Sequence, residues 1–490
     1  MVFAVVTAAS VTERWWFPYA WSEAGSLTST FYYGDATRFV DYALAIAQGR
    51  SYDNGIPYHP PGWPLLLAAL FRLSGATGSG AIPVQAIKLL TAMLSGLSVG
   101  IAAVLAGETS GLGAMLAVGL LGAFNFGHIV EGTVANSEAL YSLLMVTAVW
   151  ASWRWLRADA THRHAWAAAA AAVGGCAMLV RAEFLACAIV VAGLALVRRA
   201  RWTEIISCAT IFGIVLVPTT VWHWRTLSVF NAAHVGRVAG PLAVFAPVTS
   251  YGPFNFAMAN HEDADGGPNR DHPMLDLCNT ETGAQLEAGQ IDLACPAMYD
   301  LYVNGYAIGA RWLARNPGLA LVLVERKIAN TIGFLAQGYL ADDFAASVDG
   351  TRRRVDLVDP DRRSLISLHL LLIAAGLVAL RSRAIALGVV AAPVVALAAS
   401  AMLFYGYVRL GVAYLPVVWV LQGAGLGWLL SAITGRRAGR QTVVLALSVM
   451  ALLVAYDRST RDAPRPIVVN GPRLPNGALM QDETVDISRQ

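Results

Sequence analysis

Long runs of apolar residues, separated by short polar stretches, make up most of this 490-residue chain. A helix needs about 20 predominantly apolar residues to cross a bilayer, and irregular backbone is not tolerated where it would face lipid. The apolar runs therefore predict ten spanning helices, near residues 82–106, 111–130, 136–153, 165–181, 182–197, 204–222, 364–380, 384–404, 410–431 and 441–456. An eleventh, N-terminal span is less clearly bounded. Only Met1–Ser10 is continuously apolar, and the span could stop there or continue through Trp15–Trp21.

Composition agrees with this pattern. The chain is 56% hydrophobic and 14% charged, whereas about 25% of residues are charged in a typical soluble domain. The sequence thus predicts an all-α polytopic membrane protein with about 11 transmembrane helices. The net charge is only +3, and no basic tract interleaves with aromatic residues. Nucleic acid is therefore not an expected partner.

The positions of the arginines predict on which side of the membrane each loop lies. Four connections carry two or three arginines each, at 154–163, 198–201, 381–383 and 436–440. Short loops rich in Lys and Arg stay in the cytoplasm, and counting the predicted spans places all four loops on one side. The opposite, non-cytoplasmic side then receives residues 33–81, the 128–138 connection, Arg181 and Glu183, the long 223–363 segment, and Tyr405–Arg409.

This direction divides the chain into four predicted parts. They are a transmembrane module (1–222) with a first loop at about 22–81, a non-cytoplasmic loop domain (223–363), C-terminal transmembrane helices (364–456) and a non-cytoplasmic tail (457–490). The loop domain is too long to be structureless, so we expect helices at 300–314 and 317–334, with residues 252–297 as loop. The short apolar run at 63–73 ends in Arg72 and predicts a helix lying at the membrane interface.

The first loop holds the stretch YGDATRFVDYALAIAQGRSYDNGIPYHPPGWP, residues 33–64. Asp35 precedes a helical pattern, so it could simply cap that helix, where the helix dipole favours a carboxylate. The tyrosines before Asp35 and the cluster containing Tyr58 and His59 after it instead favour a shaped pocket. Asp41 is expected to be a second polar residue of the same interfacial helix.

Other ionisable residues are predicted at the same membrane face. Glu138 opens a span and could cap its first turn. His128 and Glu131 are three residues apart, so they could share a helix side as metal ligands do, or be ordinary surface polar residues. Three basic residues lie near the outer ends of spans, namely Lys88, Arg181 and Arg409. Each could snorkel to the interface, but as a set they could bind a phosphate at membrane level.

Several stretches together resemble the glycosyltransferase-C (GT-C) superfamily, and within it the protein O-mannosyltransferase and lipid A aminoarabinose transferase (PMT/ArnT) type. The first is GDATRFVDYALAIAQG followed by the Pro-Pro pair of YHPPGWPLLLAALFRLSG. The others, in chain order, are NSEALYSLLMVTAVWASWRWLRA, AAVGGCAMLVRAEFLACAIV, ARWLARNPGLALVLVERKIAN and YGYVRLGVAYLPVVWVL. The resemblance covers roughly residues 31–430 and lies more in the order of these motifs than in any one of them.

The resemblance implies a GT-C fold with interfacial helices in the first loop and a mixed loop domain. It also implies an inverting glycosyltransferase that moves one sugar from a polyprenyl-phosphate donor. Asp35 matches the catalytic first-loop aspartate and Glu138 the second acidic position, while Lys88, Arg181 and Arg409 match basic positions near the donor phosphate. Tyr58, His59 and Asp41 would line the acceptor pocket. Ala36 replaces the acidic residue that usually follows the aspartate, so any role that needs a carboxylate pair there is in doubt.

The implied partners are a polyprenyl-phosphate-linked sugar, membrane lipids, and an acceptor that could be protein, lipid or polysaccharide. No cofactor is required by the pattern, and a divalent metal stays open. The expected location is a bacterial inner membrane, with the active site facing the periplasm or exterior. A polymerase or ligase of lipid-linked oligosaccharides shares this membrane plan and stays open. A transporter is a poorer alternative, because we find no inverted repeats or interrupted helices.

Cysteine placement adds one further expectation. Cys278 and Cys295 are the only cysteines outside the predicted spans, and both fall in the segment assigned to the oxidising side. We predict that they form a disulfide.

Overall fold

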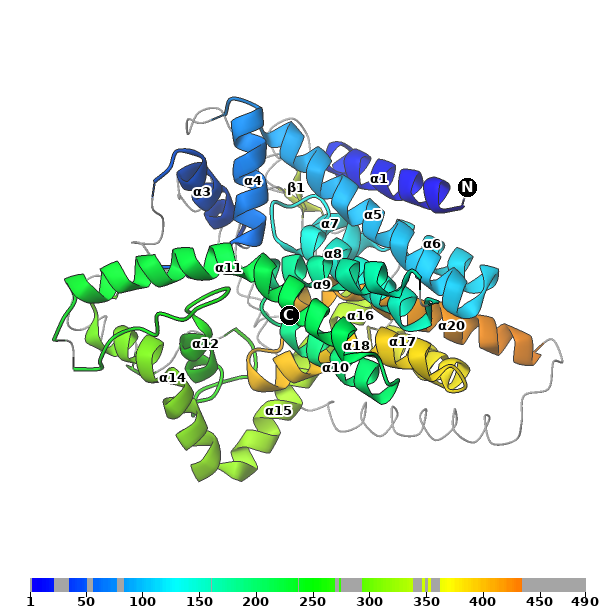
Figure 1. Ribbon diagram of the computed structural model, residues 1–490. Helices are drawn as coiled ribbons and strands as arrows, with labels where there is room; N and C mark the ends of the chain where they lie inside the picture. The colour runs from blue at the N-terminus through cyan, green and yellow to red at the C-terminus, as the bar shows by residue number, and fades with distance from the viewer. Residues whose placement is uncertain are drawn as a thin grey trace.

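The computed structural model describes residues 2–21, 35–50, 56–76, 83–159, 161–236, 238–268, 273–274, 293–337, 346–348, 351–353 and 362–433. Within these ranges the chain is a bundle of long helices with smaller helices at one end (Figure 1). The predicted span at 441–456 and the tail at 457–490 lie outside the described residues.

The bundle is centred on α5 (Val84–Ser110), which packs against α1 (Val2–Trp21), α6 (Leu112–Phe124), α8 (Glu138–Arg157) and α20 (Leu415–Ile433). Around these lie α9 (Arg163–Val180), α10 (Phe184–Val197), α11 (Trp202–Ala233), α17 (Arg362–Leu380) and α18 (Ala384–Leu403). Helices α17 and α20 approach closely because Gly376 and Gly425 leave no side chain between them. A Cβ at Gly376 would overlap the carbonyl of Leu421, and one at Gly425 that of Leu372.

Four described helices are long and apolar enough to cross a membrane: α5, α9, α11 and α18. Shorter apolar helices occupy most of the other predicted positions, including 112–123, 184–197, 365–380 and 415–429. Exposed apolar side chains line α11 in particular, among them Ile206, Ile214 and Val229. Such a surface is suited to lipid rather than water, so the structure supports the class of integral membrane protein.

Smaller helices gather at one end of the bundle, on the left of Figure 1. In the first loop, α3 (Ala36–Ala47) packs against α4 (Gly62–Leu73), which is the predicted interfacial helix. The 223–363 segment contributes α12 (Gly252–Met258), α14 (Pro296–Arg315), α15 (Pro317–Ile332) and α16 (Phe334–Gln337). It also holds a two-stranded antiparallel pair, β1 (Ala346–Val348) and β2 (Thr351–Arg353).

The opposite end of the bundle collects the arginine-rich connections, in agreement with the span count. Arg154 pairs with Glu108 near the end of α5, and Arg383 donates to the carbonyl of Thr109 one residue later. Arg163 pairs with Glu204 at the start of α11. Three of the four predicted arginine loops thus meet at one end, and the fourth, 436–440, lies outside the described residues.

Several element boundaries differ from the sequence prediction. The N-terminal span is one helix, α1, which runs on to Trp21. The predicted 111–130 span divides at Asn125, whose side chain accepts a hydrogen bond from the His128 amide and starts α7 (Phe126–Glu131). The predicted 410–431 span likewise divides into α19 (Val408–Val412) and α20.

Two boundaries in the loop domain were wrong. Helix α11 continues past residue 222 to Ala233. Apolar residues still recur in this part of the helix, although Arg225 interrupts them. Residues 252–258 form helix α12, although the 252–297 stretch was predicted to be loop. Its sequence, GPFNFAM, carries a proline near the helix start and buries Ala257 and Met258. The polar average of the surrounding stretch concealed this short apolar helix.

Candidate active site

One arginine joins the two acidic residues that the sequence singled out. Arg409 donates from Nη1 to Oδ2 of Asp35 at 3.0 Å and from Nε to Oε1 of Glu138 at 2.7 Å. Asp35 lies 374 residues from Arg409 along the chain, and Glu138 lies 271 residues away. The structure therefore assembles these three predicted residues into one ion-paired group.

The second arginine, Arg181, lies on the other side of Glu138. Its Nη1 is 3.6 Å from Oε1 of Glu138, and its Nε is 2.9 Å from Oε1 of Glu183. Glu138 thus faces two guanidinium groups at once. The complete group is Asp35, Glu138, Arg181, Glu183 and Arg409, and we call it the carboxylate–arginine group.

The members of this group come from helix ends. Asp35 occupies the N-cap position of α3, Glu138 is the first residue of α8, and Arg181 follows the last residue of α9. Neither Asp35 nor Ser137, the N-cap residue of α8, makes a side-chain capping hydrogen bond. The Asp35 side chain therefore does not cap α3 and pairs with Arg409 instead, whereas Glu138 lies in the first turn of α8 and pairs with Arg409 and Arg181.

The two acidic side chains, Asp35 and Glu138, differ in their exposure to solvent. The Asp35 side chain is 44% exposed, whereas that of Glu138 is 2% exposed. Burial alone would lower the pKa of Arg409, but the carboxylates of Glu138 and Asp35 outweigh it and hold that pKa well above its usual value. Arg409 therefore keeps its charge, and Glu138 is a buried anion compensated by fixed cations.

Ser95, His128, Glu131 and Glu138 line one closely packed region inside the bundle, with no room for a water molecule. Burial, together with repulsion from Glu138, raises the pKa of Glu131 to about 8. One of its oxygens, Oε2, is buried without a hydrogen-bond partner. Glu131 thus adds a carboxyl that is held protonated near neutral pH, close to Glu138.

His128 has a partner that the sequence did not reveal. Its Nδ1 lies 2.6 Å from Nη2 of Arg14, a fully buried arginine of α1 that also donates to Ser95 and to the carbonyl of Gly122. The His128 ring therefore keeps Nδ1 engaged with a cation. Among the described residues, no group of three or more His, Cys, Asp or Glu side chains is arranged to hold a metal ion. The proposed His128–Glu131 pair lacks a third such ligand there.

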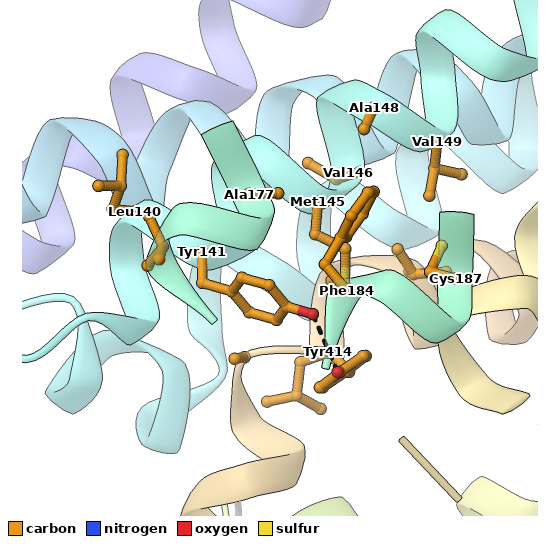
Figure 2. Close-up of a cluster of buried hydrophobic side chains, with 14 of the residues drawn as sticks. Leu140, Tyr141, Met145, Val146, Ala148, Val149, Ala177, Phe184, Cys187 and Tyr414 are labelled. Carbon is orange, nitrogen blue, oxygen red and sulfur yellow. Dashed lines mark hydrogen bonds between the residues drawn. The ribbon is translucent and has the colours of Figure 1, made fainter. Parts of the chain in front are cut away.

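Aromatic residues pack against the carboxylate–arginine group. The guanidinium of Arg181 lies 5.5 Å from the ring centroid of Tyr141, close enough for a cation–π interaction. Figure 2 shows Tyr141 pointing toward Tyr414, whose hydroxyl it meets at 3.0 Å. Both rings are fully buried. Tyr141 thus packs against Arg181 and is itself held by Tyr414.

The predicted pocket wall forms a second aromatic group. Nδ1 of His59 lies 3.0 Å from the hydroxyl of Tyr42 in α3. The Tyr58 ring packs edge-on against His59 and lies 4.9 Å from that of Tyr251. The Thr249 hydroxyl donates to the Tyr58 carbonyl, which ties the first loop to the loop domain. Tyr58 and His59 are thus brought together, whereas Asp41 is exposed on α3 between buried neighbours.

Lys88 and the cysteines complete the predicted set. Lys88 is buried in the first turns of α5. Cys295 is disulfide-bonded, and Cys176, Cys187 and Cys208 are free thiols. Cys278 lies outside the described residues, so its pairing with Cys295 stays a prediction.

Sequence reasoning did not include Arg14, Glu183 or Tyr251 among the site residues, although it placed Glu183 at the same membrane face as Arg181. A charged residue inside an apolar run was the available signal for Arg14. Glu183 shares the turn between two spans with Arg181, and an acid two residues from a predicted phosphate-binding arginine could have been considered as its partner. Tyr251 carried no local signal, because its position beside Tyr58 depends on the fold of the loop domain.

Comparison with known proteins gives only distant likenesses. No family model and no curated protein sequence matches the chain. Among solved structures, it is similar to the oligosaccharyltransferase of Archaeoglobus fulgidus in complex with Zn and sulfate, with 10% identity and a TM-score of 0.48. This likeness covers 92% of the chain and 53% of the other protein, so the chain spans about half the length of that enzyme.

The chain is also similar to ArnT from Cupriavidus metallidurans, solved bound to undecaprenyl phosphate. Here the identity is 14% and the TM-score 0.37, over 93% of this chain and 88% of the other.

Proposed function

We propose that this chain is an inverting membrane glycosyltransferase that moves a single sugar from a polyprenyl-phosphate donor to an acceptor hydroxyl. The proposal places the reaction on the non-cytoplasmic side of a bacterial inner membrane. The observation that carries it is the ion-paired contact of Arg409 with both Asp35 and Glu138. An exposed carboxylate beside fixed cations supplies the two functions that such a transfer needs. These are a base that takes the acceptor proton and positive charge that stabilises the leaving phosphate.

Asp35 is the proposed general base. The acceptor oxygen attacks the anomeric carbon and passes its proton to the Asp35 carboxylate. The bond between the anomeric carbon and the phosphate oxygen breaks, and polyprenyl phosphate leaves with the electron pair. A positioned base typically contributes 10²–10⁴-fold to such a step. Because attack and departure occur on opposite faces of the sugar, the anomeric configuration inverts.

Arg409 and Arg181 are the proposed phosphate-binding cations, with Lys88 as a third. Their side chains are 16% and 11% exposed, so each keeps an accessible part although both pair with acids. Arg409 Nη1 binds Asp35 on the exposed side of the group, where an incoming phosphate could take that bond and release the carboxylate for the acceptor. Fixed cations of this kind stabilise the charge that develops on the leaving phosphate.

Glu138 has a different proposed role from Asp35. At 2% exposure it is poorly placed to meet an acceptor hydroxyl. It faces both arginines and so holds their guanidinium groups at fixed positions. We therefore propose that it orients Arg409 and Arg181, although the motif resemblance groups it with the catalytic acids.

The acceptor pocket is proposed to lie along Tyr58 and His59, where the first loop meets Tyr251. Tyrosine and histidine rings there offer both an apolar face and hydrogen-bonding groups, which suits a sugar or hydroxyl-bearing acceptor. Asp41 is retained only as an exposed neighbour on α3.

The proposal is tested by reconstituting the purified chain in lipid nanodiscs with two donor classes. One is a polyprenyl monophosphate carrying a single sugar, and the other is a polyprenyl pyrophosphate carrying a preassembled oligosaccharide. Transfer from the first, with an inverted anomeric centre by NMR, is expected. Transfer from the second alone would favour the oligosaccharide polymerase or ligase. Movement of the intact donor across the bilayer without transfer would identify a transporter.

A further inference from the structure

The end of helix α18 is capped by side chains from the loop domain. The last carbonyl groups of a helix have no partner within it. Nζ of Lys327, in α15, donates to the carbonyl of Met402 at 3.4 Å, and Nδ2 of Asn260 donates to that of Leu403 at 2.9 Å. Arg409 follows only six residues after Leu403, the last residue of α18.

Lys327 and Asn260 also bind each other. Nζ of Lys327 donates to Oδ1 of Asn260 at 2.8 Å, and Nδ2 of Asn260 donates to the carbonyl of Phe256 in α12 at 2.8 Å. Lys327 is fully buried and Asn260 nearly so. A buried cation needs partners of this kind, and the C-terminus of a helix favours positive charge. One hydrogen-bonded pair thus joins α12, α15 and α18.

The chain between this cap and Arg409 also packs against other residues of the 223–363 segment. The amide of Gly406 donates to the carbonyl of Gly266 at 2.8 Å. A Cβ at Gly406 would overlap the backbone carbonyl of Lys327, and one at Gly411 would overlap the Phe334 ring of α16. Because α19 is only five residues long, such a helix is not stable by itself. Its position is set by α15 and α16, which pack against it.

We propose that Lys327 and Asn260 are positioning residues for Arg409. By capping α18 they fix the point from which the chain leads into α19, and so they hold the Arg409 guanidinium where the donor phosphate binds. This inference rests on the proposed function, since it takes Arg409 to be a phosphate-binding group. It makes the loop domain part of the donor site.

The test measures binding of undecaprenyl phosphate to the full chain in nanodiscs, together with its thermal unfolding. Lys327→Met removes the ammonium and keeps most of the side-chain length, and it should weaken binding by roughly 10-fold, within the range of coupled contacts. Arg409→Met should weaken binding further. If Lys327 acts through Arg409, the double variant Lys327→Met/Arg409→Met should bind no more weakly than Arg409→Met alone.

A matched control separates positioning from general stability. Asn231 exchanges two hydrogen bonds with the backbone of Leu242, each at 2.9 Å, elsewhere in the same loop segment. Asn231→Leu should lower the unfolding temperature without changing the affinity for undecaprenyl phosphate. Asn260→Asp is a second test variant if Lys327→Met does not fold. It keeps an acceptor for Lys327 but loses the donor to Leu403, and it should also weaken binding.

Additive losses in the Lys327→Met/Arg409→Met pair would overturn the inference. So would a Lys327→Met or Asn260→Asp protein that melts lower, as Asn231→Leu does, but binds undecaprenyl phosphate with unchanged affinity. These results would leave the proposed function intact, because wild type and Arg409→Met would still differ. If the wild-type protein binds no undecaprenyl phosphate, both the proposed function and this inference are wrong.

Discussion

Nη1 of Arg409 lies 3.0 Å from Oδ2 of Asp35, although 374 residues separate them along the chain. The same guanidinium holds the buried carboxylate of Glu138 on its other side. The Asp35 side chain is half-exposed, whereas that of Glu138 is buried and pairs with two arginines. The two acids should therefore respond differently to substitution.

Removing the charge of Glu138 should mainly reduce stability. In Glu138→Gln, two buried guanidinium groups lose their shared anion, and breaking a buried pair in this way costs on the order of 3 kcal/mol. We expect a clear fall in the unfolding temperature, with weaker donor binding. The control is Glu108→Gln, which breaks a more exposed pair with Arg154 and should cost under about 1 kcal/mol. Equal effects in the two variants would contradict the buried role of Glu138.

Glu131 should make stability depend on pH. It lies in the connection between two predicted spans, and burial and the Glu138 carboxylate raise its pKa from the ordinary value of 4.5 to about 8. The folded protein then binds a proton that the unfolded chain has already lost, so this group lowers stability as pH rises between these values. Glu131→Gln is fixed in the neutral state and should lack that fall.

The measurement is the unfolding temperature of Glu131→Gln minus that of wild type. This difference in unfolding temperature should increase from about pH 5 to about pH 8, because wild type loses stability over that range and the variant does not, and then level off. A difference that does not change over this range would show that Glu131 is ionised in the folded protein.

The orientation of the chain can be tested by cysteine labelling. Exposed Glu262 lies in the loop domain and exposed Arg198 in an arginine-rich connection. In a background with Cys176, Cys187 and Cys208 replaced by alanine, Glu262→Cys should react with a membrane-impermeant maleimide in intact cells. Arg198→Cys should react only after permeabilisation, since arginine-rich loops stay in the cytoplasm. The reverse pattern would place Asp35 on the cytoplasmic side.

The disulfide partner of Cys295 is expected to be Cys278. A bridge between them would close a loop of roughly 17 residues and contribute about 3 kcal/mol in the chain-entropy model. Peptide mapping without reduction should recover the two cysteines in one linked fragment. Recovery of Cys278 as a free thiol, or linked elsewhere, would contradict the pairing.

The sequence was sufficient to place residues at one end of the bundle, but not to pair them. Asp35, Glu138, Arg181 and Arg409 could be brought to one face because span ends and arginine-rich loops are strong signals. Which of them meet depends on how each helix is rotated and tilted, and packing sets this rather than hydropathy. Spans that are apolar all round, such as α10 with FLACAIVVAGLALV, carry no periodic stripe from which rotation could be read.

Long-range polar contacts were missed for the same reason. His128 could be read as a metal ligand because its partner, Arg14, lies 114 residues earlier in a span whose end was uncertain. The cap on α18 from Lys327 and Asn260 likewise joins segments 75 and 143 residues apart. No local pattern marks such contacts. The first contact requires the helices of the bundle to be packed together, and the second requires the loop domain to be placed against the bundle.

The most direct measurement of the central claim is sugar transfer by Asp35→Asn from a polyprenyl-phosphate donor in nanodiscs. Asparagine keeps the size of the side chain and can still accept from Arg409, but it cannot take the acceptor proton at neutral pH. We predict that transfer falls by about two orders of magnitude or more, with undecaprenyl phosphate binding and the unfolding temperature close to those of wild type. Near-normal transfer by well-folded Asp35→Asn would show that Asp35 is not the base.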